Sequence, residues 1–595
     1  MRLPSSERAR WLLAVVVGCL VLAAFNIWWV ATYRHGYPLD VDEAGYTMIG
    51  LNDYFGLEFH GLHGWWEAVQ TQTPNAPLLP AITSLVLVFS PGVLQGFGVL
   101  IVFGALLTLA TYGIGERLAG PRLGAIAALA VATSQGTFIF TREYIFALPT
   151  AAFLACAVYA LLRSDAMRLR GWAIACGAAV GLMLLSRTMA IAFVPGVVVA
   201  AGLLVLTRRR DDLWPRLLNL GLAVLSGVLV AATWYWRNLS PVWDYLTNFG
   251  YGTQAQYYGE SDSTLSWDRF KSVTNRMIQS DLLVPLAVLI FAGLVALGVL
   301  LFVRLRDSDD RRTELGRILG SNALAVFLVA AAGFAGLMTS QNGGNGFSYP
   351  IAILLSPLAV VALRRFQAAT IPVALLVVAI AVVNIVAHST VSDEMARARN
   401  VAVPLLGELP WVNGEEHAVS AVRVQVPGPL NHFASQDQGW TDADAELADL
   451  LQSEVEQGRV GLITFAMRNR VISTNSVGLA SVLDHHVGLP LTQIVAEPTD
   501  TVANYRRQLT DPELGLPTAL VTMSTEAGDF EPLVTQKKVE AAAKPLGFRL
   551  IHTIPLPDGR QARVWIKRPA AQAAPEPEPK KRHRSAAAPA AHGSK

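Results

Sequence analysis

Apolar segments long enough to cross a bilayer recur along the first 390 residues of this chain. The first runs from Trp11 to Thr32, and the others lie at about 93–113, 123–140, 147–162, 171–186, 188–206, 217–236, 282–303, 320–339, 348–363 and 370–388. A transmembrane helix needs about 20 apolar residues, so we expect about 11 spans. Only 15% of the residues are charged, against about 25% in soluble proteins. The sequence therefore predicts a polytopic α-helical membrane protein.

Arginines cluster before the first apolar run and in every second connection after it. Basic residues mark the cytoplasmic side of a membrane protein, so the N-terminus is expected inside. The remaining connections then face outward, at about 33–92, 141–146, 237–281 and 340–347. An odd number of spans also puts the C-terminal region outside the cell membrane. The net charge of +2 gives no reason to expect a nucleic-acid partner.

The composition becomes that of a globular domain from about residue 400 to 568. We expect helices at 441–458 (capped by Thr441), 476–487 and 531–546, with strands at 460–465, 518–523 and 549–554 and an edge strand at 561–566. Such alternation is typical of a small α/β domain. Residues 569–595 are rich in alanine, proline and basic residues, which predicts a disordered tail. The predicted domains are therefore 1–390, 400–568 and 569–595.

An acidic motif, Pro38-Leu39-Asp40-Val41-Asp42-Glu43-Ala44-Gly45-Tyr46, follows the first span directly. On a helix, Asp42 and Tyr46 share one face and Glu43 points elsewhere. One carboxylate can then face a substrate while its neighbour binds a metal, a backbone amide or an arginine. Acids at a membrane edge are costly unless they have a function. The alternative interpretation is that these acids only cap a juxtamembrane helix.

The outer loop at 33–92 contains two further features. The apolar segment Pro77 to Phe89 is too short to span, so we expect an interfacial helix. His60 and His63 have a spacing that suits a divalent metal, with Glu43 as a third candidate ligand. In the alternative interpretation both histidines simply lie at a tryptophan-rich interface, and no cofactor is needed.

The motif Asp42-Glu43-Ala44-Gly45-Tyr46, placed just after the first span, resembles the lipid-linked-sugar glycosyltransferases of the C superfamily. The resemblance is strongest to the branch of bacterial aminoarabinose transferases and protein O-mannosyltransferases. It implies the GT-C fold over residues 1–390 and a polyprenyl-phosphate sugar as donor. It also implies that Asp42 is the base acting on the acceptor and that Glu43 is the second acid. The Pro-Pro-Leu turn of that family is Ala76-Pro77-Leu78 here.

Arginines also occur at the outer edges of the predicted spans. The positive-inside rule does not account for them, because it places basic residues on the cytoplasmic side. These arginines are Arg142, Arg187 and Arg237, the last within Trp234-Tyr235-Trp236-Arg237-Asn238, an ending that also resembles the family. Arginine matches phosphate geometry, so all three are predicted to bind the donor phosphate. The alternative is that they are interfacial arginines whose charged ends reach water.

Weaker candidates for substrate binding share this outer side: Tyr46, Glu143, Asn238, Gln341, Asn342 and Tyr349. Glu143 is the only acid near Arg142, where the family often has an aspartate. The polar, glycine-rich run from Ser340 to Pro350 carries no charge, so it suits a sugar. The alternative is a plain connecting loop.

These features predict an inverting transfer of one hexosyl or pentosyl group from the polyprenyl-phosphate donor. The acceptor would be an envelope glycan, a lipid or a secreted protein, and membrane lipids would surround the enzyme. Asp42 would deprotonate the acceptor hydroxyl, and the arginines would stabilise the leaving phosphate. Two alternatives stay open: a lipid or solute transporter, and a ligase that transfers a preassembled glycan without depending on Asp42.

Overall fold

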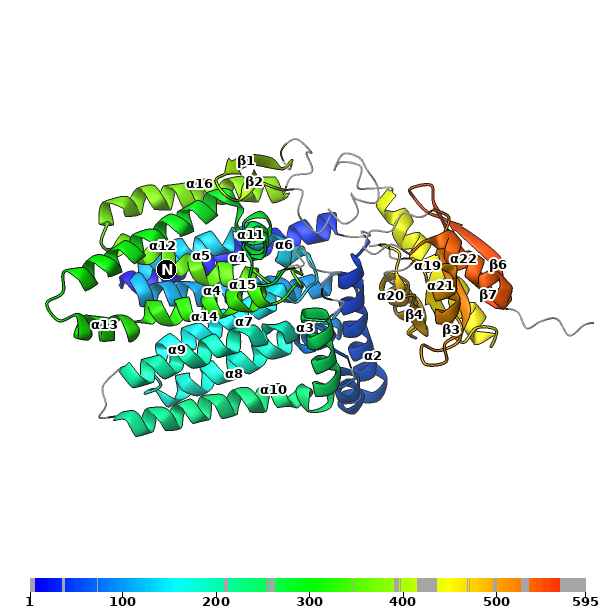
Figure 1. Cartoon of the computed structure of the whole chain (residues 1–595), viewed down its shortest axis with the longest axis horizontal. Helices are drawn as coiled ribbons and strands as arrows, with labels where there is room; N and C mark the ends of the chain where they lie inside the picture. Colours follow the sequence, from blue (N-terminus) through cyan, green and yellow to red (C-terminus); the bar gives the residue numbers. More distant parts are fainter. Residues whose placement is uncertain are drawn as a thin grey trace, which may run out of the picture.

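The structure is a computed structural model, and the described residues are 6–34, 38–71, 73–207, 212–252, 255, 263–344, 346–389, 395, 397–414, 436–467, 469, 471–495, 500–525 and 534–567. The predicted tail at 569–595 lies outside them. Figure 1 shows a helical bundle at one end of the molecule and a mixed domain of helices and strands at the other.

The chain is a multi-pass membrane protein. Within the described residues, seven helical segments are long and apolar enough to span: α1 (Glu7–Tyr33), α4 (Gln95–Ala119), η1 with α9 (Thr188–Thr207), α10 (Leu213–Gly250), α11 through α12 (Trp267–Arg306), α14 (Asn322–Thr339) and η6 with α16 (Gln367–Ser389). One further expected span coincides with a pair of helices bent by 54°, α5 (Pro121–Ala132) and α6 (Gln135–Arg142). The remaining three coincide with shorter apolar helices: α7 (Ala147–Arg163), α8 (Arg170–Ser186) and α15 with η5 (Tyr349–Arg364). Each predicted span is thus an apolar helix, and the number that cross stays a prediction.

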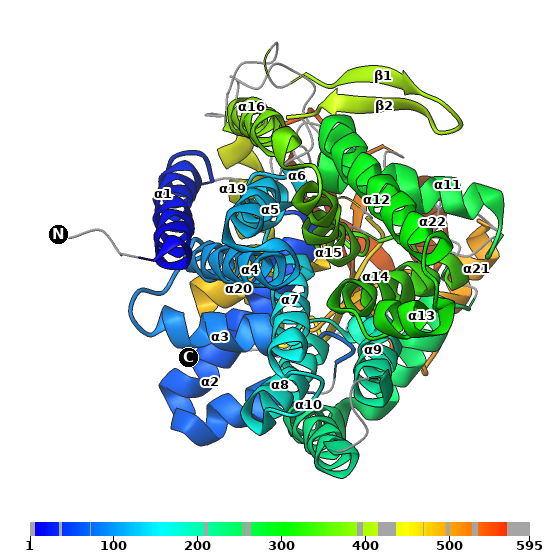
Figure 2. The same cartoon turned by 90° about the vertical axis from the view of Figure 1, so that its left-hand side faces the viewer.

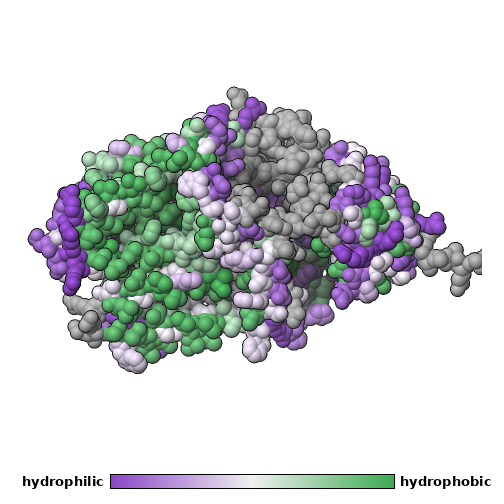
Figure 3. All heavy atoms as spheres, in the orientation of Figure 1, coloured by the Kyte–Doolittle hydropathy of each residue, from purple (hydrophilic) through white to green (hydrophobic). Residues whose placement is uncertain are grey.

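The surface of the bundle follows the same division. Figure 3 shows a hydrophobic band over the helices on the face in view, with hydrophilic residues at the left end and on the domain at the right. The left end carries α13 (Arg311–Leu319), a short charged helix. Figure 2 shows α4 between α1, α5 and α7, and these helices pack against one another. This apolar band is the part of the surface that the lipid hydrocarbon would contact.

Two helices of the first outer loop lie at the end of the bundle that faces the C-terminal domain (Figure 1). They are α2 (Val41–Val69) and α3 (Leu78–Leu87), and α3 is the short interfacial helix that the sequence predicted. A kink at Gly61, where φ is +65°, folds the end of α2 back on itself. A Cβ atom at Gly64 would lie 2.4 Å from the carbonyl oxygen of Gly56, so this hairpin requires glycine.

The C-terminal domain is built on a five-stranded sheet of order β4-β3-β5-β7-β6. Its elements are α19 (Gln436–Glu456), β3 (Leu462–Phe465), α20 (Thr474–His485), β4 (Leu491–Gln493), α21 (Val502–Gln508), β5 (Pro517–Met523), α22 (Gln536–Ala543), β6 (Phe548–Pro555) and β7 (Gln561–Lys567). Strand β3 is parallel to β4 and β5, and β7 is antiparallel to β5 and β6. The predicted α/β domain is confirmed.

Two details of that prediction are wrong. Strand β7 lies between β5 and β6 rather than at an edge, because Ala562, Val564 and Trp565 are all buried. Helix α19 begins at Gln436, so Thr441 lies inside it and does not cap it. The sequence also gave no sign of the hairpin of β1 (Arg399–Val403) and β2 (Gly407–Val412).

Candidate active site

Helix α2 begins with a capping box built from the acidic motif. The Asp40 side chain accepts a hydrogen bond from the backbone N–H of Asp42 at 3.2 Å. In return, the carboxylate of Glu43 accepts one from the N–H of Asp40 at 3.1 Å. Such a box satisfies N–H groups that the first turn leaves unpaired. The hydrogen bonds of this box are made by Asp40 and Glu43, and Asp42 lies in the same first turn, where a negative charge also favours the helix.

Glu43 is buried in an ion pair. Its two carboxylate oxygens accept from Nη2 of Arg34 at 2.9 and 2.8 Å, and one of them accepts from the backbone N–H of Tyr144 at 2.8 Å. Both side chains are almost fully buried. The pair connects the end of α1, the start of α2 and the loop after α6. Glu43 therefore holds these elements together, and its carboxylate is not exposed to a substrate.

Asp42 is exposed, in contrast to its neighbour. One helical turn on, the ring of Tyr46 packs on Phe146 with 3.9 Å between ring centroids. Burial, together with the negative charge of Asp42, raises the pKa of Tyr46 well above its usual value. Asp42 and Tyr46 therefore lie close together on one face of α2, as the spacing predicted.

Arg187 is brought to the same place. It sits at the break between α8 and η1, and its charge interacts with Asp42, Tyr46 and Tyr245 of α10. Its guanidinium lies over the ring of Phe347, 3.8 Å from the centroid. A carboxylate, an arginine and tyrosine hydroxyls thus converge from α2, the α8–η1 break and α10. This group is the candidate active site.

The structure places Arg142 elsewhere, in the interior of the bundle. Its guanidinium donates to Asn26 at 2.9 Å and to the carbonyl of His388, and it stacks on Trp29 at 4.1 Å. The side chain is fully buried. Arg142 therefore ties α1, α6 and α16 together, which the sequence did not predict. The structure does not bring it to the Asp42 cluster, and its contact with a donor phosphate stays a prediction.

The Trp-Tyr-x-Arg-Asn ending of the seventh predicted span anchors the first outer loop. Asn238 is buried and accepts from the backbone N–H of Thr73 at 3.0 Å. Gln70 donates to the carbonyl of Thr233 at 2.9 Å. Arg237 forms a half-exposed ion pair with Glu67 at 3.3 Å. The contacts of Asn238 are therefore structural, and Arg237 faces α2 near its end rather than at Asp42.

The glycine-rich loop after α14 is shaped by its own polar side chains. Asn342 is buried, donates to the carbonyl of Phe249 at 3.1 Å and accepts from the N–H of Gly344 at 2.9 Å. Tyr349 is fully buried, and its hydroxyl shares a hydrogen bond with Thr137 at 2.7 Å. The structure thus puts Tyr349 in the core, away from a substrate surface. Of the weaker candidates, Tyr46, Glu143 and Gln341 are half-buried and keep some exposed surface.

The three candidate metal ligands are not brought together. His60 and His63 are exposed at the kink of α2, and Glu43 lies 17 residues before His60 on the same helix. At about 1.5 Å per residue this separates them by about 25 Å. Among the residues that the structure describes, no three His, Cys, Asp or Glu side chains form a metal-binding group.

Sequence reasoning missed Asp53, which is buried on α2. No described residue donates a hydrogen bond to either of its carboxylate oxygens. Burial without a partner raises its pKa to about 8. The signal was present, because Asp53 follows Tyr46 by seven residues and so shares a face of the helix with it.

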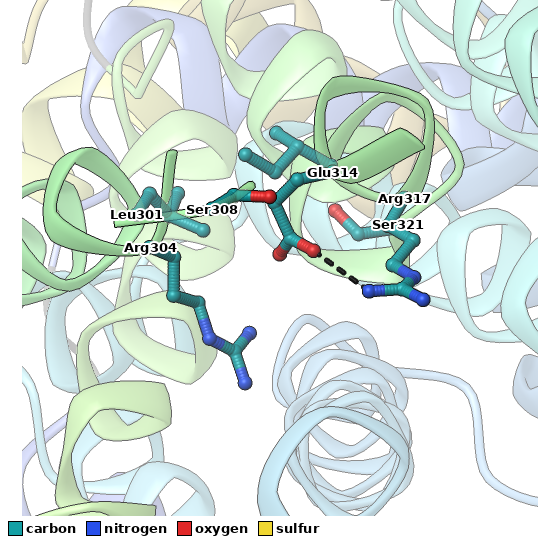
Figure 4. Close-up of a pocket in the computed structure, with 7 residues that line it drawn as sticks. Leu301, Arg304, Ser308, Glu314, Arg317 and Ser321 are labelled. Atoms are coloured by element: carbon teal, nitrogen blue, oxygen red, sulfur yellow. Dashed lines mark hydrogen bonds and ion pairs between the residues drawn. The ribbon is translucent and has the colours of Figure 1, made fainter. Parts of the chain in front are cut away.

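A hollow of about 410 Å³ lies at the opposite end of the bundle, between α12 and α13 (Figure 4). Its lining residues are Leu301, Arg304, Ser308, Glu314, Arg317, Ile318 and Ser321. Arg317 pairs with Glu314, one turn earlier on α13, at 2.9 Å. None of the candidate site residues lines this hollow, so it is separate from the Asp42 cluster.

Comparisons with known proteins bear on the family and the fold. Residues 68–236 match the family model of dolichyl-phosphate-mannose-protein mannosyltransferases, a stretch that includes Arg142 and Arg187 and ends just before Arg237. No curated protein matches the sequence.

Solved structures match over nearly the whole length. ArnT from Cupriavidus metallidurans bound to undecaprenyl phosphate is 16% identical, with 93% of this chain and 98% of ArnT covered at a TM-score of 0.52. Its apo state is 17% identical, with 94% and 98% covered at a TM-score of 0.54. The oligosaccharyltransferase AglB from Archaeoglobus fulgidus, in complex with an inhibitory peptide and a dolichol-phosphate, is 13% identical, with 91% and 73% covered at 0.50. The chain therefore has the GT-C fold, as its resemblance to the C-superfamily glycosyltransferases predicted.

Proposed function

We propose that this protein is a membrane glycosyltransferase that moves one sugar from a polyprenyl-phosphate donor to an acceptor hydroxyl. The observation that carries the proposal is the division of labour in the acidic motif. Glu43 is buried against Arg34, whereas Asp42 is exposed beside Tyr46 and within the electrostatic range of Arg187. A base and a phosphate-binding cation are the two groups that such a transfer needs most.

In the proposed reaction, Asp42 accepts the proton of the acceptor hydroxyl. The acceptor oxygen forms a bond to the anomeric carbon while the bond from that carbon to the phosphate oxygen breaks, so the configuration inverts. The electron pair leaves with the phosphate, and the charge of Arg187 stabilises it. Phosphate is already a good leaving group, so positioning and charge matter more than protonation. Tyr46 and Gln341 would contact the sugar or the acceptor.

The other arginines receive different roles in this proposal. Arg142 holds the helices behind the site through Asn26 and His388. Arg237 and Asn238 hold the first outer loop on α10. They would affect transfer through the shape of the site, and among the three predicted arginines Arg187 would contact the donor phosphate. This is a narrower assignment than the sequence predicted.

We further propose that the site and the C-terminal domain face the outside of the cell membrane, because the arginine-rich helix α13 lies at the other end of the bundle. The bound undecaprenyl phosphate of ArnT and the dolichol-phosphate of AglB support a polyprenyl carrier. The acceptor would be an envelope glycan, a lipid or a secreted protein. The identity of AglB as an oligosaccharyltransferase favours one second candidate, a ligase that transfers a whole preassembled glycan.

The experiment uses membranes that contain the full chain. Each member of a panel of polyprenyl-phosphate sugars, radiolabelled in its sugar, is added to them as a donor. Transfer of a single labelled sugar, with release of polyprenyl phosphate, is the expected result. Transfer only from a carrier bearing a preassembled oligosaccharide would support the ligase instead. No transfer from any polyprenyl-phosphate sugar, and none from a carrier bearing a preassembled oligosaccharide, would overturn the proposal.

A further inference from the structure

The C-terminal domain contacts the helix that carries Asp42. Helix α20 packs against α2, and the contacts named below follow in the same order along both helices. Near the start of α20, Nδ2 of Asn475 donates to the backbone carbonyl of Val41 at 2.8 Å. Farther along, Gly478 lies against Met48, and the ring of His486 packs on Phe55 with 4.6 Å between centroids. The first of these contacts is one residue from Asp42.

Asn475 is held firmly from its own side. Ser473 caps α20 by accepting from the N–H of Ser476 at 3.2 Å, and the Ser476 hydroxyl donates to Asp444 of α19 at 2.9 Å. Ser473, Ser476 and Asp444 are all buried. Asn475 therefore projects from a turn that the interior of the C-terminal domain fixes in place, and it can transmit that position to α2.

Helix α2 is shaped to receive this side chain. A Cβ atom at Gly45 would lie 2.8 Å from Nδ2 of Asn475, closer than side chains approach. Glycine inside a helix costs about 1 kcal/mol relative to alanine. The close approach of Asn475 accounts for a glycine at this position, where the backbone is otherwise ordinary helix.

We infer that Asn475 is a positioning residue for Asp42, through which the C-terminal domain holds the first turn of α2. The inference rests on the proposed function, since it assumes that Asp42 is the base. The first turn of α2 carries Asp42 on its exposed side and is held by Arg34 and Tyr144 on its buried side. The hydrogen bond from Asn475 adds a third restraint, from a different domain.

The main variant is Asn475→Ala, measured in the full chain with the donor that the panel identifies. We expect kcat to fall about tenfold to a hundredfold, as for a catalytic group displaced by about 1 Å. The KM for the donor should change less than about threefold, because Arg187 keeps its place. Asn475→Gln keeps the amide donor and should retain more activity than Asn475→Ala. Asp484→Asn is the matched control, because residue 484 is exposed and lies about 180° around α20 from Asn475.

A second variant tests the contact itself. Gly45→Ala should push the amide of Asn475 away from Val41 and lower kcat by a similar factor. In the Asn475→Ala background the same change should have little further effect, because the shorter side chain removes the clash. If Gly45→Ala lowered kcat by the same factor in the wild type and in Asn475→Ala, the inference would be contradicted.

Hydrogen–deuterium exchange gives a readout that does not depend on the reaction. Asn475→Ala should speed exchange of the backbone amides at the start of α2, whereas Asp484→Asn should not. Unchanged exchange there would overturn the inference even if sugar transfer is found. Faster exchange with an unchanged kcat would overturn the positioning role. Failure of the wild type to transfer any sugar would instead reject the proposed function, and the exchange result would stand by itself.

Discussion

The carboxylate of Glu43 accepts two hydrogen bonds from the guanidinium of Arg34, at 2.8 and 2.9 Å, inside the protein. The adjacent Asp42 is exposed. Two acids that are neighbours in sequence therefore occupy different environments, because successive residues of a helix point about 100° apart. This separation buries one acid in an ion pair and leaves the other at the surface.

The two acids should differ sharply when each is changed to its amide. Glu43→Gln leaves Arg34 as an uncompensated buried charge, so it should destabilise the protein by about 3–5 kcal/mol. Asp42→Asn should change stability by less than about 0.5 kcal/mol, because its side chain is exposed. Thermal unfolding followed by tryptophan fluorescence would compare them. Equal losses of stability would contradict the assignment of Glu43 as the structural acid.

Arg187 and Arg237 should differ in their effect on the donor. Arg187→Gln should raise the KM for the polyprenyl-phosphate sugar and lower kcat, because the leaving phosphate loses its counter-charge. Arg187→Lys should restore the KM and the kcat only in part, since lysine lacks the planar guanidinium of arginine, which can donate two parallel hydrogen bonds. Arg237→Gln is the comparison, because its ion pair with Glu67 is half-exposed and worth about 0–1 kcal/mol. Steady-state kinetics with the donor would compare the two variants. A larger loss of kcat/KM in Arg237→Gln than in Arg187→Gln would contradict the assignment of Arg187 to the donor phosphate.

Asp53 predicts a pH-dependent stability. An unfolded aspartate has a pKa of about 3.9, and the folded carboxyl has one of about 8. Between these values the unfolded chain releases a proton that the folded protein keeps, so stability falls as pH rises, by at most about 1.4 kcal/mol per pH unit. Asp53→Asn removes this loss. The unfolding temperature of the variant should therefore exceed that of the wild type by more at pH 8 than at pH 5, and a constant difference would contradict the prediction.

Asn238 should matter more for stability than its neighbour Arg237. Asn238→Ala leaves the backbone N–H of Thr73 without its acceptor and should cost about 1–3 kcal/mol. The control, Arg237→Ala, should cost less than about 1 kcal/mol. Limited proteolysis of the first outer loop would detect the difference, with faster cleavage expected only in Asn238→Ala.

Much of the fold could be predicted from the sequence, because lipid imposes a simple rule on it. Apolar length predicted the helices of the bundle and the short helix α3, and alternating patterns predicted β3, β5 and β6. The central position of β7 could not be predicted, since strand order depends on contacts between distant segments. The same is true of the contact between α20 and α2.

The candidate site was predictable only in part. The spacing of Asp42 and Tyr46 predicted their shared face. The sequence predicted donor-phosphate binding for Arg142, Arg187 and Arg237 alike, and it did not distinguish the one whose charge interacts with Asp42. The burial of Arg142 could not be predicted, because it depends on Asn26 and His388, which lie far away in the sequence. An arginine at the edge of a span looks the same in sequence whether it faces a phosphate or the core.

The most direct test of the central claim is transfer of a single labelled sugar by membranes that contain equal amounts of wild type or Asp42→Asn. If Asp42 is the base, the amide should lower transfer by at least about a hundredfold, while the unfolding temperature stays the same. Transfer at the wild-type rate by a folded Asp42→Asn protein would contradict the proposed mechanism.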